Sequence, residues 1–168
     1  MNRKLLGIYL NDHLAGSTAG VELARRAAGA NEGNEYGAFL ASLADAIQED
    51  RESLRDIMRR LEYGEDIPKK VGAWTAEKLG RLKPNGQLRG YSPLSRVVEL
   101  EGLTLGITGK LALWKSLQEL VGEEPRLEAE ELGRLRERAE RQQSDIEGYR
   151  LRAVREAYLG SPGVAGSE

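Results

Sequence analysis

The residues from Glu35 to Tyr63, EYGAFLASLADAIQEDRESLRDIMRRLEY, carry the clearest helical periodicity in this chain. Apolar side chains recur there every three or four residues, which is the spacing of one face of an α-helix. That face comprises Tyr36, Leu40, Leu43, Ile47, Asp50, Leu54, Ile57 and Leu61. Arg59 and Arg60 in the last turn and Gly64 beyond them are typical of a helix C-terminus. The stretch therefore predicts one long amphipathic helix.

Three other segments share this spacing and predict helices over residues 3–28, 92–121 and 126–159. Short turns join the first two helices and the last two, so each pair is expected to form an antiparallel hairpin. The connection between the hairpins is long, and Pro68 begins a predicted short helix over residues 69–82. The sequence thus predicts an all-α, antiparallel four-helix bundle with a long crossover.

This bundle is expected to be one domain, residues 1–160, followed by a disordered tail at residues 161–168. The chain has no cysteine, which excludes disulfides, thiolate zinc sites and a cysteine nucleophile. Its 25 basic and 27 acidic residues nearly cancel, so the overall charge indicates no nucleic-acid partner. No apolar run approaches the roughly 20 residues of a membrane span, and we expect a cytoplasmic protein without membrane contact.

Two long-helix hairpins joined by a crossover with a short helix make the layout of residues 3–159 resemble the ferritin-like four-helix bundle superfamily. The Glu-x-x-His motifs of that superfamily are absent. His13 is the only histidine, and no glutamate lies three residues before it. The resemblance therefore implies the fold of a divergent member, without its di-iron chemistry.

Polar residues interrupt the predicted buried stripes near the middle of the bundle. Counting from each helix midpoint places His13, Asp50, Thr108 and Gln142 close to one layer. A buried aspartate needs a partner, and protonated His13 is the expected one. One interpretation is a structural hydrogen-bond network, which we favour; the other is a catalytic site with His13 as base and Asp50 as orienting acid.

Glu22, Glu49 and Glu101 could supply oxygen ligands for a divalent metal such as Mg²⁺ or Mn²⁺ at a similar level. Charged residues make up 31% of the chain, however, so chance alignments of acids are common. We therefore expect no cofactor, with a divalent metal as the alternative.

The predicted crossover is basic. Lys69, Lys70, Lys78 and Arg81 could form a patch for a phosphate, a nucleic-acid backbone or an acidic partner. We favour a solvated linker helix and do not expect nucleic-acid binding.

Small residues gather on two of the predicted helices, although each glycine costs a helix about 1 kcal/mol relative to alanine. They are Ala15, Gly16, Ala19 and Gly20 on the first helix and Gly102, Gly106 and Gly109 on the third. Close helix packing, within the chain or across a homodimer face, is the expected reason. A ligand pocket beside the small residues is the alternative.

No phosphate-loop or nucleophile-elbow motif is present. The leading hypothesis is a non-enzymatic bundle with a structural or protein-interaction role, forming a homodimer through an apolar helix face. The alternatives are a metal-assisted or His13–Asp50 enzyme and a basic-patch binding module.

Overall fold

The computed structural model describes residues 1–66 and 91–160, and every regular element in these ranges is an α-helix. The helices are α1 (Arg3–Ala30), α2 (Glu35–Arg60), α4 (Pro93–Gln118) and α5 (Ala129–Leu159). The predicted all-α class with four long helices is confirmed. The predicted short helix at residues 69–82 and the tail at residues 161–168 lie outside the described residues.

Polar caps begin three of the four helices. The Asn2 side chain accepts a hydrogen bond from the Leu5 amide, and the Ser92 hydroxyl accepts one from the Ser95 amide. Asn34 accepts from the amides of Tyr36 and Gly37 at the start of α2. These side chains satisfy backbone donors that have no partner within a helix, so they determine where each helix begins.

The helix ends differ by a few residues from the predicted ones. Helix α2 ends at Arg60 instead of Tyr63, because Glu62 adopts a positive φ of 61° and the Tyr63 amide bonds back to Met58. Helix α5 begins at Ala129 instead of Arg126, since residues 124–127 form a turn closed by the Leu127 amide on the Glu124 carbonyl. The spacing of apolar residues does not define where a helix ends, because the same spacing can continue into the turn that follows.

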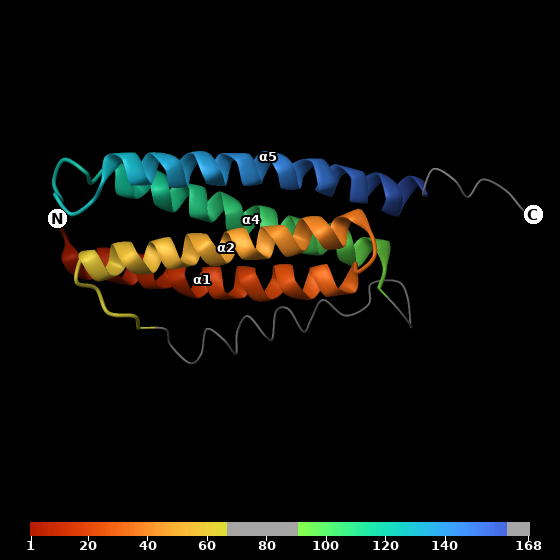
Figure 1. Ribbon diagram of the computed structural model, residues 1–168, viewed down its shortest axis with the longest axis horizontal. Helices are drawn as coiled ribbons and strands as arrows, with labels where there is room; N and C mark the ends of the chain where they lie inside the picture. Colours follow the sequence, from red (N-terminus) through yellow and green to blue (C-terminus); the bar gives the residue numbers. More distant parts are fainter. Residues whose placement is uncertain (67–90, 161–168) are drawn as a thin grey trace, which may run out of the picture.

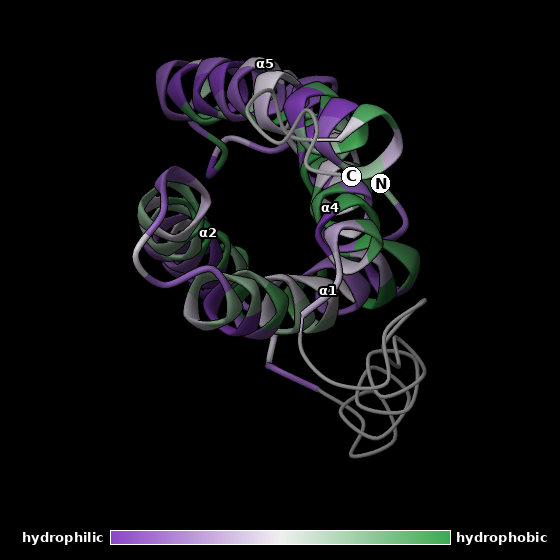
Figure 2. Cartoon of the chain, turned by 90° about the vertical axis from the view of Figure 1, so that its right-hand side faces the viewer, coloured by the Kyte–Doolittle hydropathy of each residue, from purple (hydrophilic) through white to green (hydrophobic). Residues whose placement is uncertain are grey.

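The four helices lie side by side around a common axis (Figures 1 and 2). Helix α1 packs on α2 and on α4, and α5 packs on α4 and, more loosely, on α2. Figure 2 also shows that α5 carries mostly hydrophilic residues. Two helix pairs, α1–α2 and α4–α5, thus face each other across the core.

Two side-chain hydrogen bonds show which helix ends lie close together. Arg3 at the start of α1 donates to the Leu61 carbonyl just after α2, with an N–O distance of 2.7 Å. At the other end, Arg96 on α4 donates to the Asn31 side chain after α1, also at 2.7 Å. The end of α2 and the start of α4 lie at opposite ends of the bundle (Figure 1).

The apolar core consists of two separate clusters, one towards each end of the bundle. The first cluster includes Leu10, Leu14, Leu54, Ile57, Leu111, Trp114 and Leu135. The second includes Val21, Leu40, Ile47, Leu100, Leu103, Ile107 and Ile146. The clusters leave a middle layer between them, and the candidate site occupies this layer. None of the described helices is long and apolar enough to cross a membrane.

Candidate functional site

A buried polar trio occupies the middle layer: Asp50 on α2, Lys110 on α4 and Gln142 on α5. Lys110 Nζ donates to Asp50 Oδ2 and to Gln142 Oε1, and Gln142 Nε2 donates to Asp50 Oδ2 at 3.1 Å. The Asp50 side chain is 2% exposed and that of Lys110 is 13% exposed. The trio therefore links α2 to α4 and α5 through hydrogen bonds that are largely shielded from water.

A further pair of charged residues, Arg138 and Glu49, connects this trio to the surface. Arg138 on α5 forms an ion pair with Asp50 Oδ1, without the geometry of a hydrogen bond, and donates to Glu49 Oε2 at 3.2 Å. Burial lowers the pKa of Lys110 below its usual value, Asp50 opposes this shift, and Arg138 adds to it. Two cations and two carboxylates thus balance, so the layer has no excess charge.

His13 is not the partner of Asp50, and that expectation was wrong. Its ring packs edge-on against Tyr9, with centroids 4.6 Å apart, and the partners of Asp50 are those described above. Desolvation lowers the pKa of His13 below 6.5, while nearby Asp12 opposes the shift. A neutral imidazole cannot be the cation that balances Asp50, and Lys110 has that role.

The middle-layer prediction holds for Asp50 and Gln142, which are buried and in contact. Thr108 lies outside this layer, because its side chain is solvent-exposed and accepts a hydrogen bond from Gln143. Lys110 was not among the residues expected in this layer. The missed signal was its spacing, since Lys110 lies three residues after Ile107 and four before Trp114 on the buried stripe of α4.

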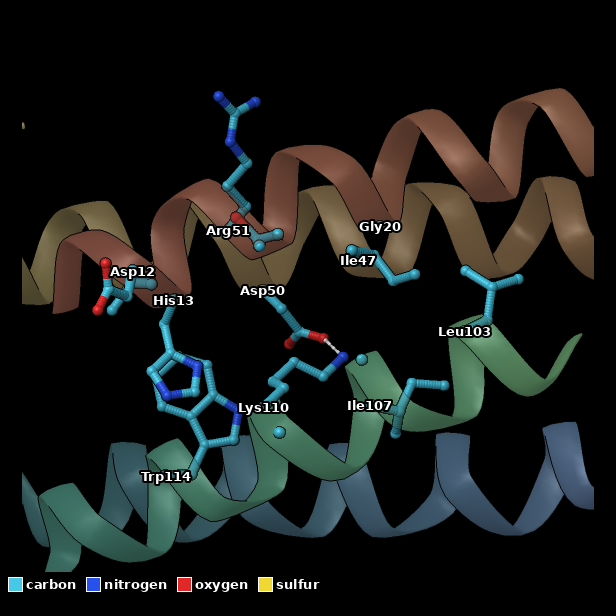
Figure 3. Close-up of a pocket in the computed structure, with 16 residues that line it drawn as sticks. Asp12, His13, Gly20, Ile47, Asp50, Arg51, Leu103, Ile107, Lys110 and Trp114 are labelled. Carbon is cyan, nitrogen blue, oxygen red and sulfur yellow. Dashed lines mark hydrogen bonds and ion pairs between the residues drawn. The ribbon is translucent and has the colours of Figure 1, made fainter. Parts of the chain in front are cut away.

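A cavity of about 250 Å³ lies beside the trio, between α1, α2 and α4 (Figure 3). Asp50 and Lys110 form its polar floor, and His13 lines it from α1. The apolar wall consists of Ile47, Leu54, Leu103, Ile107 and the ring of Trp114. The cavity thus combines an apolar wall with a few polar groups, as small-molecule sites do.

Glycines form the mouth of this cavity. A Cβ atom added at Gly16 on α1, or at Gly106 or Gly109 on α4, would meet no neighbouring atom within 4 Å. Only Gly102 among the α4 glycines faces a tight neighbour, with Leu23 Cδ2 at 3.2 Å from its added Cβ. Close packing within the chain, which we favoured, therefore explains Gly102 but not the three others.

Trp114 contributes a polar atom to the cavity that has no partner. Its side chain is 1% exposed, and Nε1 has no hydrogen-bond partner. Figure 3 shows the nitrogen edge of the indole turned towards the side of the cavity where Lys110 meets Asp50. A buried donor without an acceptor is uncommon, because it loses water without compensation.

The predicted metal ligands do not converge. Glu22, Glu49 and Glu101 are all exposed; Glu49 pairs with Arg138, and Glu101 lies 3.7 Å from Arg150. Across residues 1–66 and 91–160, no group of three or more His, Asp or Glu side chains is placed to hold a metal ion. The basic-patch residues Lys69, Lys70, Lys78 and Arg81 lie outside the described residues.

Comparisons of the chain with protein-family models, with curated proteins and with solved structures found no match. The interpretation of the site therefore depends on its own geometry and chemistry.

Proposed function

We propose that this protein is a non-enzymatic helical bundle that binds a small molecule in the cavity between α1, α2 and α4. The observation that carries this proposal is the cavity of about 250 Å³, which Trp114 lines with a buried, unpartnered Nε1 and which Gly16, Gly106 and Gly109 also line. Each glycine weakens its helix by about 1 kcal/mol relative to alanine, and no packing contact at these positions offsets the loss. A ligand that needs the space would supply the reason.

The polar floor supports binding in preference to catalysis. Asp50 Oδ2 accepts from Lys110 and Gln142, and Oδ1 is paired with Arg138. A general base must be able to reach the substrate proton, and the contacts with Lys110, Gln142 and Arg138 hold this carboxylate against cations and an amide of the protein. His13 is separate from this group, so a His13–Asp50 pair has less support than a structural role for the trio.

The first test is to fill the mouth of the cavity. We expect Gly106→Leu to keep or raise the melting temperature of the free protein, because its Cβ meets open space and leucine favours a helix. We expect the same variant to lose the melting shift that one- and two-ring compounds, indane first among them, produce in the wild type. Raised stability with lost binding is the usual sign of a functional site.

Gly148→Leu is the matched control. Gly148 lies on α5, is exposed, does not line the cavity and also has no neighbour within 4 Å of an added Cβ. This variant should keep the ligand-induced shift. The binding function is wrong if the ring compounds leave the melting temperature of the wild type unchanged. It is also wrong if they raise the melting temperature of Gly106→Leu as much as that of the wild type.

We also infer that the bundle is a divergent ferritin-like one with antiparallel hairpins and a long crossover, and that it forms a homodimer. The helix-end contacts and the opposite positions of the end of α2 and the start of α4 support the layout.

Met1, Leu5 and Ile8 are 55%, 61% and 52% exposed along one stripe near the start of α1, which would suit a dimer contact. Light scattering of the wild type and of Leu5→Glu measures the mass directly; a monomeric wild type would exclude the dimer.

A further inference from the structure

We propose that the ligand of this cavity is a neutral ring compound with one carbonyl-type acceptor, which receives a hydrogen bond from Trp114 Nε1. This inference rests on the proposed binding function and specifies the chemical class of the ligand. Three properties of the cavity lead to it: the buried Nε1 donor of Trp114, which has no partner, a floor without excess charge, and a small apolar volume.

The acceptor follows from Trp114. The indole N–H is a donor only, and this one is desolvated already in the free protein. An acceptor on the ligand therefore gains a hydrogen bond without the protein having to lose water at that atom. A ligand without an acceptor would leave the donor as it is, so the site distinguishes between the two.

The neutral charge follows from the floor. Lys110 is paired with Asp50, and Arg138 bridges Asp50 to Glu49. Figure 3 shows the guanidinium of Arg51, which also lines the cavity, pointing away from this floor. A carboxylate or an amine placed on the floor would have to compete with the Lys110–Asp50 ion pair, which is already formed and largely buried.

The size and shape follow from the walls. The cavity measures about 250 Å³, whereas an engineered protein cavity of about 150 Å³ binds benzene. Ile47, Leu103 and Ile107 provide apolar contacts, and the glycine backbones of α1 and α4 provide a mouth free of side chains. One or two fused rings fit this space.

The experiment compares 1-indanone with indane, which share a ring system and differ in one carbonyl group. We expect the wild type to bind 1-indanone about ten-fold more tightly in titration calorimetry, as one hydrogen bond to a desolvated donor implies. In Trp114→Phe, which keeps an aromatic ring but no donor, the two compounds should bind equally, with indane unaffected.

A nuclear magnetic resonance measurement on the unsubstituted protein covers the case in which Trp114→Phe fails to fold. The chain has two tryptophans, and a Trp74→Phe variant identifies the indole signal of Trp114. That N–H signal should move downfield with 1-indanone and much less with indane.

Each result has a separate meaning. If indane binds as tightly as 1-indanone and the Trp114 signal responds alike to both, the acceptor is wrong while the binding function stands. If indane-1-carboxylate binds more tightly than 1-indanone, the neutral class is wrong. If none of the three compounds binds and Gly106→Leu behaves like the wild type, the binding function itself fails.

Discussion

Lys110 holds its charge in the middle of the bundle, where a lysine is seldom found without a partner. Hydrogen bonds to Asp50 and Gln142 replace those that its ammonium group would make to water. These two residues accept hydrogen bonds from two of its three N–H groups. Such a pair adds little net stability, because desolvation of both ions offsets most of their attraction. Its main effect is a penalty on arrangements that separate the two charges.

His13 gives a prediction at the scale of one residue. Burial lowers its pKa in the folded protein below the 6.5 of the unfolded chain. Between these two pKa values the unfolded state binds more protons than the folded state. The free energy of unfolding therefore increases as pH rises through this range and decreases as pH falls. We expect urea denaturation to show a decline between about pH 7 and pH 5 that is smaller in His13→Gln.

The titration of His13 can be followed directly, because it is the only histidine in the chain. Its ring protons should report a pKa below 6.5 in the folded protein. A pKa above 6.5 would mean instead that a carboxylate stabilises the imidazolium, and the environment described for His13 would be wrong.

At the scale of elements, α2 and α4 differ in the residues that form their buried faces. Helix α2 has a continuous stripe of large apolar residues interrupted only by Asp50, and its sequence alone predicts a helix. Helix α4 combines large buried residues with glycines that face α1 and the cavity. The amphipathic pattern of α4 is therefore weaker than that of α2, because glycines occupy positions on the side of α4 that lines the cavity.

The turn between α1 and α2 gives a prediction for an element. A Cβ atom added to Gly37 would lie 2.9 Å from the carbonyl carbon of Asn31 and closer still to its oxygen. That carbonyl belongs to the backbone and also accepts from the Asn34 amide, so it cannot move freely. We expect Gly37→Ala to lower the free energy of unfolding by about 2 kcal/mol or more in urea denaturation.

Gly29→Ala is the control for this turn, because the last residues of α1 leave open space around an added Cβ there. It should be neutral or raise stability by up to about 1 kcal/mol through helix propensity. Equal effects of the two substitutions would show that the contact between the start of α2 and Asn31 does not restrict the turn.

At the scale of the whole molecule, the polar layer separates two apolar clusters that would otherwise form one core. Asp50, Lys110 and Gln142 come from α2, α4 and α5, so they can pair only in one axial alignment of these helices. Sliding α2 by one helical turn along α4 and α5 would bury these groups against leucine and isoleucine. Such a shift carries the penalty of unpaired polar groups.

Asp50→Asn tests the polar layer against its complete replacement. The single substitution leaves Lys110 without its counter-ion and should lower the free energy of unfolding by about 3 kcal/mol. The triple variant Asp50→Leu, Lys110→Met and Gln142→Leu removes every member of the trio. Its stability should lie within about 1 kcal/mol of the wild type or above it, since apolar packing replaces the buried ions.

Asp45→Asn serves as the control in the same denaturation series, because Asp45 is an exposed aspartate on the same helix. It should change stability by less than about 0.5 kcal/mol. A triple variant as unstable as Asp50→Asn would mean that the hydrogen bonds of the trio stabilise the fold outright.

The sequence by itself determined the helices, the buried stripes and part of the polar layer. Helix positions depend on local spacing and on caps such as Asn34 and Ser92, and these signals lie within a few neighbouring residues. Asp50 and Gln142 could be assigned to the core for the same reason, because each lies between apolar residues at helical spacing.

Only the tertiary structure decided which residues meet. Whether His13 or Lys110 reaches Asp50 depends on the rotation and axial shift of whole helices, and one position along a helix turns a side chain by about 100°. Whether Gly106 allows close packing or leaves a cavity depends on the distance between α1 and α4. These quantities result from the sum of all contacts between helices, and no short stretch of sequence contains them.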